Sequence, residues 1–108
     1  MKLIDIKPLG HPVRVLVDGE VVAETDRALL LDETGLPGRI YVPREDVRQE
    51  LVTPGDKRTH CPWKGHASYW TVAGAENAAW SYEAPKQKVA EIAGHLSFAG
   101  ASVVIQRR

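Results

Sequence analysis

The chain lacks the features that tie proteins to polyanions, membranes or disulfide frameworks. Its 14 basic and 14 acidic residues cancel, so no net charge attracts nucleic acid or an anionic surface. No apolar run is long enough for a signal peptide or a bilayer span. The single cysteine, Cys61, excludes an internal disulfide and a multi-cysteine zinc site. These absences predict a cytoplasmic protein with no nucleic-acid or membrane partner.

The chain also lacks internal repeats, linkers and low-complexity stretches, which predicts a single domain over residues 1–108. A chain of this length buries roughly 65% of its extended surface, which is enough for one modest core. We therefore expect one compact unit without a second domain.

Alternating apolar residues predict strands over much of the sequence. Val13, Val15 and Val17 repeat with a period of two, and the Asp18-Gly19 pair behind them is a strong hairpin signal. Further strands are expected over residues 20–25, 27–32, 39–42, 66–73, 78–83, 96–98 and 102–106. Hairpins dominate this order, so the expected fold is mainly β (α+β) with antiparallel sheets.

Two short helices are expected between the strands. One covers residues 44–51, because Pro43 precedes it and acidic residues favour its positive end. The second opens at Pro85 and ends at Gly94, which suits a left-handed cap. The charged run at residues 56–58 is interpreted as a solvated loop.

Residues 59–82 are the most informative segment of the chain. They hold five of the seven aromatic residues, the only cysteine and a lysine directly after a tryptophan. Buried tyrosines and tryptophans need partners for their O–H and N–H groups, so these rings form either a partly exposed cleft or an ordinary aromatic core, and the sequence leaves both open. The candidate ligand-binding residues are Tyr41, Trp63, Lys64, Tyr69, Trp70, Trp80 and Tyr82.

The turn between the last two long strands decides which of these rings share a face. A turn at residues 74–77 places Tyr69 opposite Tyr82 and Thr71 opposite Trp80. Tyr69, Trp80 and Tyr82 then lie on one face of the pair, while Trp70 lies on the other.

Cys61 and Lys64 are the candidate catalytic residues. A cation such as Lys64 favours the reactive thiolate form of a nearby cysteine. His60 directly precedes Cys61, but neighbouring residues of a regular strand point to opposite faces. The alternatives are structural, since a lone cysteine packs as a small hydrophobe and a lysine extends over an aromatic core with its ammonium in water.

The remaining polar residues do not match a known metal or phosphate motif. The four histidines have no recognised ligand spacing, so we expect no metal site and no cofactor. The acidic pairs Asp32-Glu33 and Glu45-Asp46 are adjacent residues, whose side chains diverge on regular elements.

A longer motif surrounds the aromatic segment. It reads T-x-C-P-W-K-G-x-A-x-Y-W over residues 59–70, A-W-x-Y-x-x-P over 79–85, G-x-L-x-F over 94–98, H-P-V over 11–13, A-E-T over 23–25 and Y-V-P-R-E-D-V over 41–47. In these blocks the chain resembles the bacterial family called domain of unknown function 427, which is sometimes labelled nucleotidyltransferase-like.

The resemblance implies two antiparallel sheets of the β-tent, Mss4-like kind, with two short helices. β-tent relatives commonly hold zinc between two Cys-x-x-Cys pairs, which this chain does not contain. Family members often have an aromatic residue where this chain has Ala99, directly after Phe98, and the smaller side chain would open a cleft there.

Three functions are compatible with the sequence. The favoured one is binding of a small molecule or modified residue in an aromatic cleft near Trp63 and Lys64. The second is an enzyme that uses Cys61 or Lys64 on a small substrate. The third is an interaction protein that forms a homodimer through an edge strand or an aromatic patch.

Overall fold

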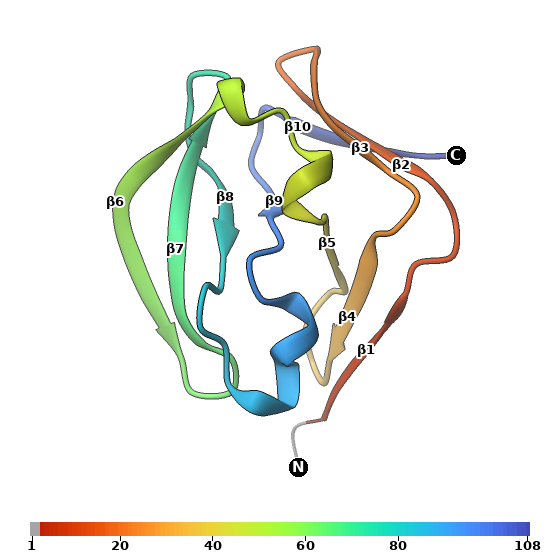
Figure 1. Cartoon of the computed structure of the whole chain (residues 1–108), viewed down its shortest axis with the longest axis vertical. Helices are drawn as coiled ribbons and strands as arrows, with labels where there is room; N and C mark the ends of the chain where they lie inside the picture. Colours follow the sequence, from red (N-terminus) through yellow and green to blue (C-terminus); the bar gives the residue numbers. More distant parts are fainter. Residues whose placement is uncertain (1–2) are drawn as a thin grey trace.

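The computed structural model describes residues 3–108, which form ten strands and three short 3₁₀ helices (Figure 1). The strands are β1 (Ile4–Pro8), β2 (Val13–Val17), β3 (Glu20–Thr25), β4 (Leu29–Glu33), β5 (Arg39–Tyr41), β6 (Val52–Cys61), β7 (Gly65–Val72), β8 (Ala75–Ser81), β9 (Ser97–Phe98) and β10 (Val103–Arg107). The 3₁₀ helices are η1 (Arg44–Asp46), η2 (Gln49–Leu51) and η3 (Gln87–Ile92).

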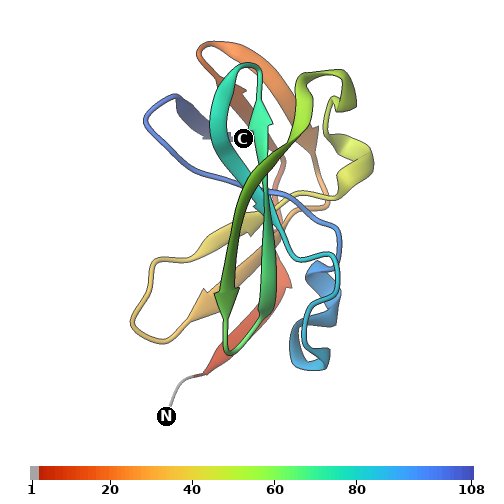
Figure 2. The same cartoon turned by 90° about the vertical axis from the view of Figure 1, so that its left-hand side faces the viewer.

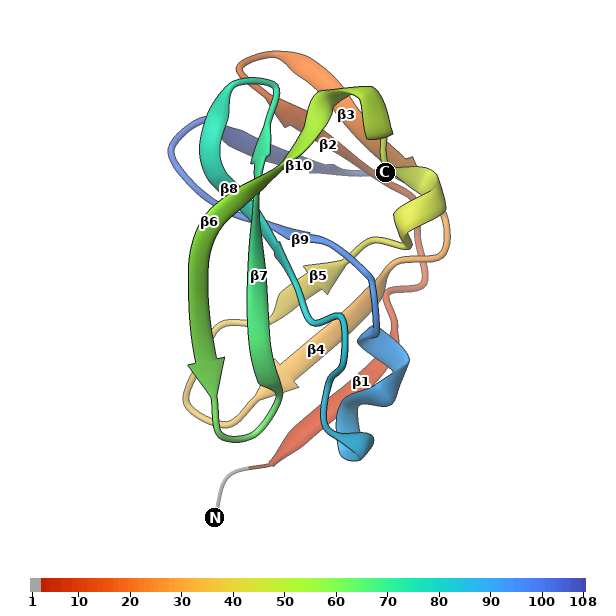
Figure 3. The ribbon, with the colours of Figure 1, turned by 60° about the vertical axis from the view of Figure 1, so that its left-hand side comes forward.

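Every strand pair in the three sheets is antiparallel, which confirms the predicted mainly β fold class. The sheet orders are β1-β4-β5, β10-β2-β3 and β6-β7-β8-β9. Figure 3 shows the first sheet below and the second above, with β6 and β7 running along the height of both. The expected count of two sheets is therefore wrong by one, while the β-tent label stays a prediction.

The β2–β3 hairpin follows the sequence pattern directly. Val13, Val15 and Val17 are buried and alternate with half-buried residues, as their period of two predicts. Asp18 and Gly19 have φ angles of 49° and 81°, so both central residues of the turn adopt the left-handed conformation. This is the geometry that a two-residue hairpin loop requires.

The β7–β8 turn differs from the prediction. It is made by Ala73 and Gly74, with φ angles of 47° and 81°, and not by residues 74–77. Tyr69 consequently lies opposite Trp80, and not opposite Tyr82. The pairing moves by two residues, an even number, so the predicted sharing of faces is preserved.

The single helix predicted over residues 44–51 is wrong. Val47 is extended (φ −102°, ψ 138°) and forms a β-bridge with Ala23, which separates η1 from η2. The Arg48 N–H also donates to the Val22 carbonyl at 2.8 Å. Hydrogen bonding to β3 and burial of the valine side chain override the local helical signals.

The second predicted helix is a 3₁₀ helix, η3, that starts two residues after Pro85. Its Val89 and Ile92 side chains are fully buried, and Gly94 adopts the expected left-handed φ of 71°.

The sequence interpretation also missed β1 and β6. Residues 56–58 are not a loop but part of β6, the outer strand of the four-stranded sheet. The register of β6 shifts between Pro54 and Arg58, so the strand bulges there. The charged side chains of this segment give no alternating apolar pattern from which a strand could be predicted, because an exposed edge strand needs no continuous apolar face. Figure 2 shows the long β6–β7 hairpin across the front of the molecule.

The two faces of the β7–β8 ladder contribute to different parts of the core. Val72 and Ala79 pack with valines of the β2–β3 hairpin, and Trp70 covers this cluster. Ala67 and Tyr82 pack with Leu31 of β4 and with η3. Because successive strand residues point to opposite faces, one ladder supports both clusters and brings a ring-rich face toward β4 and β5.

Candidate functional site

A cavity of about 490 Å³ lies against the ring-rich face of the β7–β8 ladder. Its lining residues are Leu31, Glu33, Leu36, Pro37, Arg39, Tyr41, Lys64, Tyr69, Asn77, Trp80, Tyr82, Ala99 and Gly100. They come from β4, β5, β7, β8 and the segments that connect or follow the strands. The fold therefore brings residues 31–41 and 64–82, which are distant in sequence, around one hollow.

The aromatic wall of the cavity is held by a ring pair and two hydrogen bonds. Tyr69 and Trp80 are opposite each other in the β7–β8 ladder, with ring centroids 6.4 Å apart. The Trp80 indole N–H donates to the Tyr41 hydroxyl at 3.2 Å. The Tyr69 hydroxyl lies 3.2 Å from the Thr59 hydroxyl of β6. These contacts fix the rings in place before any ligand enters.

Burial keeps the deeper phenols of the site protonated. Tyr41 is 1% exposed and Tyr82 is 5% exposed. Burial raises the pKa of Tyr41 to about 12, and it also raises the pKa of Tyr82. Within residues 3–108 the Tyr82 hydroxyl has no hydrogen-bond partner, so it is available to donate to a bound molecule.

A buried ion pair joins two cavity residues. The Lys64 Nζ lies 2.6 Å from the Glu33 Oε1, and the side chains are only 12% and 4% exposed. The same ammonium lies 5.9 Å from the centroid of the Tyr82 ring. The backbone of the turn is anchored as well, because the Lys86 N–H donates to the Lys64 carbonyl at 2.9 Å.

Arg39 supplies a second cation. Its guanidinium carbon lies 5.4 Å from the centroid of the Trp80 ring, and the side chain is exposed. Among the described residues no carboxylate pairs with it. Arg39 and Lys64 oppose the one carboxylate of Glu33, so the cavity lining carries a net charge of +1.

Asn77 adds an amide to the lining. It sits in the irregular part of β8 with a left-handed φ of 56°. Its buried Oδ1 accepts no hydrogen bond within the described part of the chain. The oxygen packs against Gly55, where an added Cβ would lie 2.8 Å from it. A buried acceptor without a donor costs free energy, and because this oxygen is fully buried against Gly55, a ligand in the cavity does not reach it.

The structure brings Tyr41, Lys64, Tyr69, Trp80 and Tyr82 of the predicted set together around the cavity. Trp63 and Trp70 of that set do not line it. Trp63 is 50% exposed in the β6–β7 turn. Trp70 lies on the opposite face of β7 by strand alternation, where its indole donates to the Ser81 hydroxyl at 2.9 Å and stacks with Arg44.

The candidate nucleophile Cys61 is also outside the cavity lining. It is half-buried and packs against the cluster that contains Ala67 and Tyr82. His60 and Cys61 both lie in the regular part of β6, opposite His66 and Gly65 respectively. Their side chains therefore point to opposite faces, and no His60–Cys61 dyad forms.

The predicted site set did not contain the cavity residues Arg39 and Asn77, and Glu33 had no specific predicted role. The signal for two of them was present, because Arg39 shares a strand face with Tyr41 and Glu33 shares one with Leu31. Asn77 had no such signal, since the irregular pairing of β8 positions it.

The acidic pair Glu45-Asp46 has structural partners. Asp46 accepts a hydrogen bond from the Thr25 hydroxyl at 2.7 Å and pairs with Arg27 at 3.0 Å. Glu45 also pairs with Arg27, at 3.2 Å. Across residues 3–108 no three histidine, cysteine or acidic side chains gather as metal ligands. None of the described helices has the length and apolarity needed to cross a membrane.

Comparison with curated proteins gave no significant match. A family model described as "Domain of unknown function (DUF427)", with the short label NTP_transf_9, matches residues 5–107. The match includes both sides of the cavity and the whole aromatic motif. The chain belongs to the domain of unknown function 427 family.

Proposed function

We propose that the protein binds a small planar molecule, neutral or singly anionic, in the cavity between Tyr69, Trp80 and Lys64. The main support is that four aromatic side chains converge with Lys64, Arg39 and Glu33 around one hollow of about 490 Å³. That volume lies within the range of roughly 300–1,000 Å³ that is usual for small-molecule sites.

The charge of the lining favours this ligand class over a methylated ammonium. Aromatic cages bind quaternary amines when ring faces are open and no competing cation is present. Here an arginine already stacks on Trp80 and an ammonium lies near Tyr82. A cationic ligand would meet a net charge of +1, whereas a carboxylate or phosphate would meet a donor fork in Arg39.

The polar groups support recognition of a heterocycle. The neutral Tyr82 hydroxyl supplies a hydrogen-bond donor to the cavity. A carbonyl oxygen or an unprotonated ring nitrogen of a flat heterocycle accepts from this donor. The exposed side of Arg39 then faces any anionic substituent.

Binding is favoured over lysine- or cysteine-dependent catalysis. A nucleophilic lysine needs an amine that is free to attack the substrate, but the Lys64 Nζ is held in a buried ion pair, 2.6 Å from the Glu33 Oε1. Cys61 is not among the cavity residues. Nucleotidyl transfer, which the family label suggests, needs carboxylates that hold metal ions. Residues 3–108 contain no cluster of three or more metal-ligating side chains.

A tryptophan fluorescence titration tests the proposal. The probes are uracil, glutarimide, benzoate, indole-3-carboxylate and tetramethylammonium. We expect a saturable change with the planar probes and none with tetramethylammonium. The change should vanish in Trp80→Phe and persist in the matched variants Trp63→Phe and Trp70→Phe. Calorimetry on Trp80→Ala should show affinity weaker by about tenfold.

Arg39→Gln separates the charge contribution from the stacking contribution. It should weaken binding of benzoate and indole-3-carboxylate more than binding of uracil. The proposal fails if no planar probe binds at millimolar concentration. It also fails if the signal is lost in Trp63→Phe and retained in Trp80→Phe, since the ligand would then lie on the exposed hairpin turn.

A further inference from the structure

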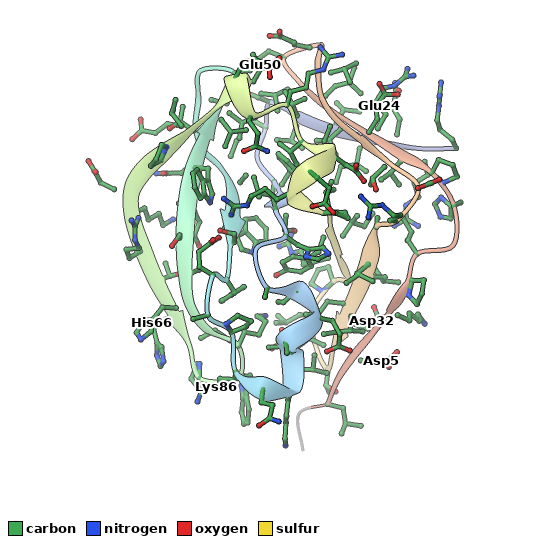
Figure 4. The ribbon with its side chains drawn as sticks, in the orientation of Figure 1. Asp5, Glu24, Asp32, Glu50, His66 and Lys86 are labelled. Carbon is green, nitrogen blue, oxygen red and sulfur yellow. The ribbon has the colours of Figure 1, made fainter. Side chains whose placement is uncertain are left out.

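Two histidines that the sequence separates by six positions face each other on the β6–β7 hairpin. His60 lies directly opposite His66 in the strand register, and the ring centroids are 4.7 Å apart with the planes tilted by 40°. Both side chains are exposed. Figure 4 shows His66 at the lower end of this hairpin, outside the ribbon.

This arrangement has the dimensions of a chelating pair. Imidazole nitrogens bind zinc at about 2.0–2.1 Å, so two ligands on adjacent coordination positions lie about 3 Å apart. Rings with centroids at 4.7 Å reach that separation by small side-chain rotations, since their exposed positions leave them free to turn. The backbone register holds the two ligands together, so the entropy of bringing them together is already lost on folding.

The surroundings leave the pair accessible. The next residues on the same face are Arg58 and Ser68, which are also opposite each other. The Arg58 guanidinium donates to the carbonyls of Gly55 and Lys57, at 2.9 and 2.8 Å, so it is engaged along the β6 bulge. β6 is the outer strand of its sheet, so one side of the pair is open to solvent.

We infer that His60 and His66 form a bidentate binding site for a divalent late transition metal. Two imidazoles suit copper, nickel and zinc, with Cu²⁺ bound most tightly in the usual order of affinities. Water, or ligands from another molecule, completes the coordination shell, because the described residues supply no third ligand. The site is separate from the aromatic cavity, whose lining contains neither histidine.

Calorimetric titration of the untagged protein with Ni²⁺, Cu²⁺ and Zn²⁺ tests this site. His60→Ala and His66→Ala should each weaken Ni²⁺ binding by about 100-fold, the loss expected when a second tethered ligand is removed. The double variant should be no weaker than either single variant, because chelation needs both rings. The control variants His11→Ala and His95→Ala remove half-buried histidines that bond only to backbone carbonyls, and they should bind like the wild type.

Thermal unfolding gives a second readout. Ni²⁺ should raise the melting temperature of the wild type and of both controls, and leave both hairpin variants unchanged, since only the folded register forms the pair. Because both residues are exposed, the variants should melt like the wild type without metal. The inference is overturned if either single substitution leaves Ni²⁺ affinity within a factor of two, or if the losses in the double variant add. It is also overturned if the His11 and His95 controls lose as much affinity as the hairpin variants.

Discussion

Glu33→Gln should destabilise the protein more than any exposed charge substitution. The change keeps the shape of the side chain but removes the negative charge from beside Lys64. Both side chains are close to fully buried, at 4% and 12% exposure, and their charged atoms lie 2.6 Å apart. Removing one partner of such a pair leaves an uncompensated charge in the interior, which costs about 3 kcal/mol or more.

A double-mutant cycle distinguishes the pair from simple packing. Lys64→Met should cost a similar amount, since it removes the cation from beside a buried carboxylate. Lys64→Met combined with Glu33→Leu should be much less damaging than the sum of the single changes, because no buried charge is left. The matched control is Glu24→Gln, which breaks a solvent-exposed pair with Arg14 at 3.1 Å and should cost less than about 1 kcal/mol.

Urea unfolding followed by circular dichroism measures these free energies. For a domain of this size, 3 kcal/mol lowers the melting temperature by roughly 12 °C or more. The destabilisation should change little between low and high salt, since buried pairs are screened weakly. If Glu33→Gln and Glu24→Gln have equal effects, or if the cycle shows no coupling, the ion pair does not organise this part of the cavity.

Two further predictions concern the buried phenol and the β7–β8 turn. Tyr41 has a pKa raised to about 12, so the folded protein holds a proton that the unfolded chain releases near pH 10. Stability should therefore be independent of this group below about pH 10 and fall by about 2–3 kcal/mol as the pH rises to 12. Urea unfolding at pH 8 and pH 11.5 measures the loss, and an equally steep loss in Tyr41→Phe would assign it to other groups. Ala73 has a left-handed φ of 47°, a conformation that asparagine adopts at lower cost than alanine. Ala73→Asn should therefore stabilise the protein by about 0.5–1 kcal/mol in thermal unfolding. The strand control Ala75→Asn should give no gain, and a gain equal to that of Ala73→Asn would contradict the turn argument.

Local patterns determined a large part of this fold. The alternation of Val13, Val15 and Val17 identified β2, and Asp18-Gly19 identified its turn. The expected turn of even length placed Tyr69 and Trp80 on one face of the β7–β8 pair, and the two-residue change in pairing preserved that assignment. These inferences succeeded because side-chain alternation and turn conformation depend on the backbone of a few neighbouring residues.

Contacts between distant segments decided the rest. The β-bridge from Val47 to Ala23 broke the expected helix, and the antiparallel ladder made an edge strand from a charged segment. Glu33 forms an ion pair with Lys64 only because β4 and the β6–β7 turn border the same cavity.

Strand register in particular cannot be predicted from local sequence patterns. His60 and His66 carry no ligand spacing in the sequence, yet the β6–β7 register places their rings 4.7 Å apart. Alternation determines which way a side chain points. The residue that it meets is chosen by the packing of whole strands, where burial over many residues outweighs any single local preference.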